Sequence, residues 1–100
     1  MIKTSFIIPK ADNNGVKYPR KLIREIESDI IKIAGGLTKT DIVGFWQNDK
    51  KLFIDRNNYY FTTIQDNQYN KIIQALSHYK ILLKQESIYI DRQKIEIEFI

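Results

Sequence analysis

The sequence predicts an α+β fold in which two helices pack on one face of an antiparallel sheet. Two stretches carry apolar residues at helical spacing, and the others carry β-branched and aromatic residues in short runs. In chain order these stretches run strand, helix, strand, strand, helix, strand, which is the ferredoxin-like split βαβ arrangement. Two right-handed crossovers place both helices on the same side and leave the other sheet face open.

The composition fits one domain spanning residues 1–100 and excludes several classes of site. The chain has 43% hydrophobic and 28% charged residues, which is ordinary for a globular domain. It has no cysteine, which removes disulfides, thiolate metal sites and a cysteine nucleophile, and its single histidine is His78. We therefore expect no cofactor, no bound metal and no catalytic residues.

Location and origin follow from two further features of the composition. No apolar run approaches the roughly 18–20 residues that span a bilayer, and no signal peptide is evident, so we expect a cytoplasmic protein without a membrane partner. The chain has 19 isoleucines against 2 valines, a bias typical of AT-rich genomes. This bias suggests a bacterium or one of its mobile elements.

The first half of the chain predicts a strand, a loop and a helix. Residues 2–9 read as a strand that ends at Pro9, which cannot donate to a strand ladder. Residues 10–18 contain an Asn-Asn-Gly turn, and Pro19 suits the first helical position. Gly35-Gly36 then ends the helix. The apolar stripe of this helix consists of Leu22, Ile23, Ile26, Ile30 and Ile33.

Two strands and a tight turn follow the first helix. Thr38 to Gln47 is the second strand, and Asn48-Asp49-Lys50 is a plausible turn into the third. The run from Leu52 to Gln65 is long for one regular strand. We therefore expect a bend or bulge at residues 55–58.

The second helix and the end of the chain complete the pattern. Asp66 is a good N-cap for the helix. Residues 87–90 and 94–100 read as strand, with residues 91–93 forming a turn or a kink between them. The alternation places Ile95, Ile97 and Phe99 inward. The apolar stripe of the second helix consists of Tyr69, Ile72, Ile73, Leu76, Tyr79 and Leu83.

Three short motifs resemble a known group of proteins. They are Gly35-Gly36-Leu37-Thr38, Gly44-Phe45-Trp46 and the Leu-Lys-Gln-Glu-Ser-Ile run at residues 83–88. Together they resemble an uncharacterised family of short bacterial proteins with Gly-Leu-Thr, Gly-x-Trp and Gln-Glu-Ser-Val/Ile motifs, over roughly residues 20–90. The resemblance implies a ferredoxin-like fold and no assigned activity. The chain departs from the family before Gly35, where the aromatic and proline pattern is missing.

A basic segment is the first candidate site. Residues 1–24 carry six cations and one acid, so the net charge of +4 is concentrated there. A helix N-terminus surrounded by cations suits a phosphate, a nucleotide or a nucleic-acid backbone. The alternative is a solvated basic face without a ligand. The candidate anion-binding residues are Lys10, Lys17, Arg20, Lys21 and Arg24.

Aromatic residues in the strands form the second candidate. Aromatic side chains on an open sheet face can contact a partner protein or a second copy, and they can stack nucleic-acid bases. The Lys/Arg-Gly-Phe-x-Phe signature of RNA-recognition modules is absent from the third strand, which carries Asp55 instead. A position in the core is the remaining alternative. The candidate interaction residues are Trp46, Tyr59, Tyr60 and Tyr89.

These features lead to one leading function and two alternatives. The leading hypothesis is a non-enzymatic interaction module, a protein-directed regulator or inhibitor that forms a homodimer. The first alternative is nucleic-acid or phosphoanion binding through the basic segment. The second is a small metal-dependent nuclease using Asp41, Asp55 and Asp91. Such nucleases carry an aspartate at the end of the first strand, where this chain has Pro9-Lys10.

Overall fold

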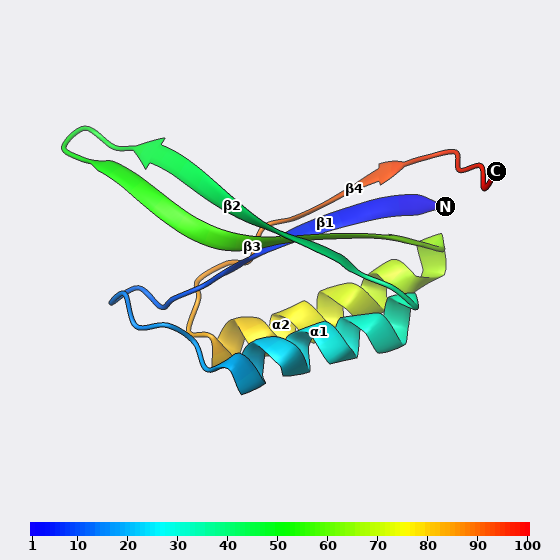
Figure 1. Ribbon diagram of the computed structural model, residues 1–100, viewed down its shortest axis with the longest axis horizontal. Helices are drawn as coiled ribbons and strands as arrows, with labels where there is room; N and C mark the ends of the chain where they lie inside the picture. Colours follow the sequence, from blue (N-terminus) through cyan, green and yellow to red (C-terminus); the bar gives the residue numbers. More distant parts are fainter.

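The computed structural model describes residues 1–100 and contains a four-stranded antiparallel sheet with two helices against one face (Figure 1). The strand order is β2-β3-β1-β4, which confirms the predicted ferredoxin-like βαββαβ fold. No helix is long and apolar enough to cross a membrane. The elements are β1 Ile2–Pro9, α1 Arg20–Ala34, β2 Thr38–Gln47, β3 Leu52–Ile64, the 3₁₀ turn η1 Asp66–Gln68, α2 Tyr69–Leu82 and β4 Ile90–Lys94.

Helix α1 begins and ends where its sequence signals predict, within one residue. Pro19 is the N-cap, with φ −59° and ψ 140°, rather than the first helical residue. Gly35 closes the helix at φ +82°, and its N–H donates to the Ile31 carbonyl at 2.7 Å. Ile26 and Ile30 are buried, so the predicted stripe faces the sheet. A glycine is favoured at this left-handed position because it has no Cβ to clash.

The core lies between the two helices and the covered face of the sheet. Phe6 of β1 and Tyr60 of β3 stack at its centre, with ring centroids 5.0 Å apart. Helix α2 contributes the buried side chains predicted for it, among them Ile72 and Leu76. The buried apolar residues of the core are Ile2, Phe6, Ile8, Ile26, Ile30, Tyr60, Ile64, Ile72, Leu76, Tyr79 and Leu83.

Two tyrosines tie the helices and the 10–18 loop together. The Tyr79 hydroxyl of α2 donates to the Asp29 carboxylate of α1. The Tyr18 hydroxyl donates to the Leu83 carbonyl at 2.6 Å and accepts from the Gln85 amide at 2.8 Å. These bonds anchor the loop to the end of α2, so the basic segment that follows has a fixed position.

Two local predictions in the middle of the chain are wrong: the bulge offered as one alternative at residues 55–58, and the N-cap at Asp66. Strand β3 contains no bulge at residues 55–58, because its register with β2 runs unbroken from Gln47↔Leu52 to Thr38↔Phe61. The strand instead curves smoothly along its length (Figure 1). Asp66 is not the N-cap. It is the first residue of the 3₁₀ turn η1, whose N-cap is Gln65, and the N-cap of α2 is Gln68. The Gln65 N–H donates to the Gln68 side chain at 2.8 Å.

The end of the chain also differs from its prediction. Residues 90–94, expected to include a turn or kink, form β4, whereas residues 95–100 form no strand. The ladder with β1 ends at the pair Ile2↔Lys94, and beyond it the Ile95 N–H donates to the Met1 carbonyl at 3.3 Å. Phe99, expected to face inward, is 93% exposed.

Strands β2 and β3 extend beyond the rest of the fold. The last pair between β1 and β3 is Pro9↔Asn57, so residues 43–56 form a two-stranded ribbon, which we call the hairpin arm. In Figure 1 the arm reaches past both helices to the upper left. Its turn is held by the Asn48 side chain, which accepts from the N–H groups of Lys50 and Lys51 at 2.9 Å. The predicted turn at this position is confirmed.

Helix α2 ends in a left-handed residue that is not glycine, and this generates a stability prediction. Lys84 has φ +55°, and the N–H groups of Lys84 and Gln85 donate to the carbonyls of Ile81 and Lys80. Glycine is favoured at this position of such a helix end. We expect Lys84→Gly to raise the free energy of unfolding by about 1 kcal/mol, measured by urea denaturation.

Gly35→Ala is the matched control for Lys84→Gly. A Cβ added at Gly35 meets nothing within 4 Å, so only backbone strain opposes the change. We expect a loss of about 1 kcal/mol. A decrease in stability for Lys84→Gly would contradict the assignment of strain to Lys84.

Candidate functional site

A pocket of about 490 Å³ opens between the start of α1, the 10–18 loop and the helix-facing side of β2 and β3. We call it the basic pocket. It brings together four of the five predicted anion-binding residues, whereas Lys21 is exposed and does not line it. The lining residues are Lys10, Lys17, Tyr18, Arg20, Ile23, Arg24, Glu27, Lys39, Asp41 and Asn58.

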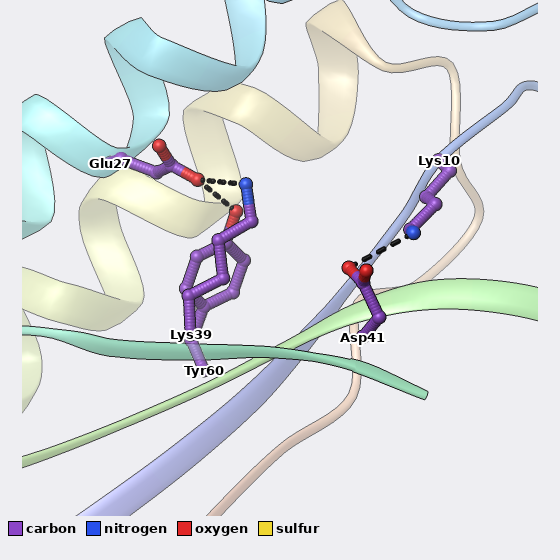
Figure 2. Close-up of polar contacts among 5 residues, drawn as sticks. All are labelled: Lys10, Glu27, Lys39, Asp41 and Tyr60. Atoms are coloured by element: carbon purple, nitrogen blue, oxygen red, sulfur yellow. Dashed lines mark hydrogen bonds and ion pairs between the residues drawn. The ribbon is translucent and has the colours of Figure 1, made fainter. Parts of the chain in front are cut away.

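The two carboxylates of the basic pocket are already paired (Figure 2). Asp41 accepts from the Lys10 ammonium at 2.9 Å, and this hydrogen bond lowers the pKa of Asp41. Glu27 accepts from the Lys39 ammonium at 2.8 Å and from the Tyr60 hydroxyl at 2.5 Å. Each acid is thus neutralised by a lysine from a neighbouring segment.

Three cations of the basic pocket have no acidic partner. Lys17, Arg20 and Arg24 form no ion pair within 4.0 Å. The first turn of α1 contains no acidic residue and has no side-chain cap. The backbone N–H groups of Arg20 and Lys21 donate to no group in the chain. The pocket therefore has an excess of positive charge beside free N–H donors.

Asn58 is a pocket residue that the sequence analysis missed. It pairs with Asp41 across the β2–β3 ladder and is only 6% exposed. Its side-chain amide makes no hydrogen bond within the chain, although it lines the basic pocket. The sequence did contain a sign of its role, because asparagine is depleted in strands and the rest of this strand is rich in apolar and aromatic residues.

Three of the four predicted interaction residues lie on the open face of the sheet. Trp46 stacks on Phe53, with centroids 3.9 Å apart, and remains 50% exposed. Tyr59 pairs with Ile7 in the ladder, and the Ile7 N–H donates to the Tyr89 carbonyl at 3.2 Å. The side chains of Tyr59 and Tyr89 therefore flank Ile7 on the face without helices.

The prediction that Tyr60 belongs to the interaction surface is wrong. Tyr60 is 1% exposed and stacks on Phe6 beneath the helices. Side chains alternate between the faces of a strand, so Tyr59 and Tyr60 cannot share a face. The alternative prediction for these aromatic residues, a position in the core, is correct for Tyr60.

The hairpin arm exposes large apolar side chains that the sequence analysis did not single out. On the side that faces the helices elsewhere in the sheet, Phe45 is 67% exposed and its ladder partner Ile54 is 58% exposed. Val43 and Leu52 on the same side are 46% and 53% exposed. Their alternation is that of a half-buried strand, yet no helix reaches them.

The three aspartates of the nuclease alternative each have a separate partner within the chain. Asp41 pairs with Lys10, Asp55 accepts from the Trp46 indole at 2.7 Å, and Asp91 accepts from the Tyr89 hydroxyl at 2.6 Å. No group of three histidine, aspartate or glutamate side chains is placed to hold a metal ion. His78 is exposed on α2, edge-on to Tyr79.

Solved structures share this fold. The divalent cation tolerance protein CutA of Archaeoglobus fulgidus superposes with a TM-score of 0.71 at 11% identity, over 99% of this chain and 88% of that chain. A PII-like protein CutA from Nostoc gives 0.65 at 8% identity, over 96% and 82%. A phage SAM lyase in complex with S-methyl-5′-thioadenosine gives 0.58 at 13% identity, over 93% and 80%.

Comparison of the sequence with known proteins does not assign the chain to a family. No protein-family model matches the chain, and no curated protein does. At these low identities the structural likeness establishes the fold alone. The same architecture carries proteins described as tolerance, PII-like and lyase proteins, so function has to be argued from the surfaces of this chain.

The buried phenol of Tyr60 generates a pH prediction. Burial, and then the Glu27 carboxylate, raise the pKa of Tyr60 well above its ordinary value of about 10. The folded state therefore keeps the proton while the unfolded state loses it. This stability is present below about pH 10 and is lost as the pH rises further.

Comparison with Tyr60→Phe isolates this contribution from the lysines that titrate in the same range. Above about pH 10 we expect the wild type to lose up to about 1.4 kcal/mol of unfolding free energy per pH unit more than the variant. Urea denaturation at about pH 9 and pH 11 measures the difference. Identical slopes would show that the Tyr60 pKa is not raised.

Proposed function

We propose that the protein is a small non-enzymatic binding module whose hairpin arm associates with protein, first of all with a second copy of the same chain. One observation supports this most strongly. The arm exposes large apolar side chains on both faces, with Phe45 and Ile54 on one and Trp46 on the other. Exposed apolar patches on a folded protein mark interaction surfaces.

The edge of the arm supports the same proposal. Strand β2 lies at the edge of the sheet, so its outer N–H and C=O groups have no strand partner. Natural edge strands are usually protected by charges, prolines or bulges. The run Ile42 to Trp46 contains no charge and no proline, and its ladder is regular. Such an edge is suited to pairing with another strand.

Charge favours association between copies through the arm. The chain carries +4 overall, so two copies repel one another on average. The arm holds Asp49, Asp55, Lys50, Lys51 and Arg56, which leave only one surplus positive charge. Two copies can therefore meet at the arm with little repulsion.

The arm is also rigid enough to bind without a large loss of conformational entropy. Trp46 is held by its stack on Phe53 and by its bond to Asp55, and the turn is closed around Asn48. A surface ordered before binding loses less freedom on association. Neighbours of the fold described as PII-like and as cation tolerance proteins support a binding role, and a regulator or inhibitor acting on another protein would use the same arm.

Sedimentation of wild-type and arm-variant protein tests the proposal. We expect the mass of the wild type measured by sedimentation to rise above the 11.9 kDa of one chain as the protein concentration increases from about 5 to 500 µM. Phe45→Ser combined with Ile54→Ser removes two exposed apolar side chains, and we expect at least about tenfold weaker association.

Ile81→Ser is the matched control, because Ile81 on α2 is 72% exposed and lies away from the arm. We expect its association to equal that of the wild type. A wild type that stays monomeric throughout, or an equal loss in the control, would rule out self-association through the arm.

A further inference from the structure

We propose that the basic pocket binds a small phosphate-bearing molecule, through a phosphate monoester or pyrophosphate group contacted by Lys17, Arg20, Arg24 and Asn58. This inference goes beyond the association proposed for the arm. It concerns a different surface, and it stands whether or not the chain forms oligomers.

The first argument is the charge of the pocket. Its two carboxylates are each paired with a lysine, Asp41 with Lys10 and Glu27 with Lys39. Five cations and two carboxylates leave three surplus positive charges in one concave site. Cations at a helix N-terminus are unfavourable, because the helix dipole places partial positive charge there. A bound anion removes this repulsion.

The second argument is the supply of donors. The N–H groups of Arg20 and Lys21 in the first turn of α1 are unpaired, and no side chain caps the helix. Helix N-termini of this kind bind phosphate oxygens. Arg20 and Arg24 add two guanidinium groups, whose forked geometry matches a phosphate group with two parallel hydrogen bonds.

The third argument is independent of the helix and concerns Asn58. Only 6% of this residue is exposed, and its amide takes part in none of the side-chain hydrogen bonds of the chain. The fold therefore holds this residue in place, while its amide is left free to bond a partner from outside the chain. No side-chain polar atom of the chain is both fully buried and unpaired. The Asn58 amide therefore keeps its access to solvent, and it does so on the wall of the pocket.

The size and lining of the pocket select a small polar ligand over nucleic acid. A volume of about 490 Å³ lies in the range of small-molecule sites, and only Tyr18 and Ile23 among the lining residues are hydrophobic. Nucleic acid needs a row of cations along its backbone. Here Lys21 lies outside the pocket, and the carboxylates of Glu27 and Asp41 interrupt the lining. Both features favour a single phosphate-bearing group.

Titration of ¹⁵N-labelled protein with inorganic pyrophosphate, and separately with inorganic phosphate, tests the proposal. We expect saturable shifts of the Arg20 and Lys21 backbone N–H signals together with the Asn58 side-chain NH₂ signal. The signals of Lys71 and Lys94, which lie outside the pocket, are expected to stay in place. Shifts spread over all lysines, or an unmoved Asn58 signal, would overturn the site.

Two variants that each remove one positive charge distinguish binding in the pocket from general attraction of the anion to the basic surface. Arg24→Gln removes a pocket cation, and we expect pyrophosphate to bind at least about tenfold more weakly. Lys21→Gln removes the same charge one turn away but outside the pocket, and we expect a change below about twofold. Equal losses in the two variants contradict the proposal. Asn58→Ala tests the contribution of the amide to pyrophosphate binding. If this variant does not fold, the comparison of Arg24→Gln with Lys21→Gln still tests the proposal.

A single-stranded oligonucleotide in the same assay separates nucleic acid from a small phosphate ligand. We expect its binding to be weaker than that of pyrophosphate and equally sensitive to Lys21→Gln and Arg24→Gln. Tighter oligonucleotide binding that displaces pyrophosphate would assign the surface to nucleic acid and overturn the proposal.

Discussion

The structure depends on a mismatch of length between its helices and its central hairpin. Helix α1 has 15 residues and is about 22 Å long, whereas β3 has 13 residues and is about 43 Å long. Two such helices can cover only one end of the sheet. The apolar alternation of β2 and β3 continues past that end, so Phe45 and Ile54 carry core-type side chains where no core exists.

The same mismatch creates the basic pocket. The pocket lies where the helix layer stops, and it is lined by the first turn of α1 and by residues at the base of the hairpin. Tyr18 holds the loop against the end of α2, and the pair Lys39–Glu27 ties the hairpin to α1. Asn58, a proposed ligand contact, lies four residues after Ile54 in β3. Ligand in the pocket and partner on the arm would thus contact one continuous strand.

Sequence reasoning found what local chemistry and periodicity determine. The helical stripes, the Gly35 helix end, the turn at Asn48 and the clustering of Lys17, Arg20 and Arg24 all depend on residues close together in the chain. It failed where the outcome depends on register. The alternation from Ile95 to Phe99 is stronger than that from Ile90 to Lys94, but only the latter has β1 as a neighbour.

Register also explains the errors and omissions in the candidate sites. Whether Tyr59 or Tyr60 faces the helices is fixed by pairing with β1, which no local pattern reveals. Asn58 became a pocket residue because that pairing turns it toward α1 at the point where the helix layer ends. Exposure of Phe45 follows from the relative lengths of elements that are far apart in the sequence.

Amide hydrogen exchange tests most directly whether a partner covers the arm. We expect residues 43–47 and 52–56 to exchange several-fold more slowly at about 200 µM than at about 2 µM protein, because association protects them. Residues 2–8 of β1, already inside the sheet, are expected to exchange at the same rate at both concentrations. Equal exchange of the arm at the two concentrations would mean that it stays uncovered, which contradicts the account.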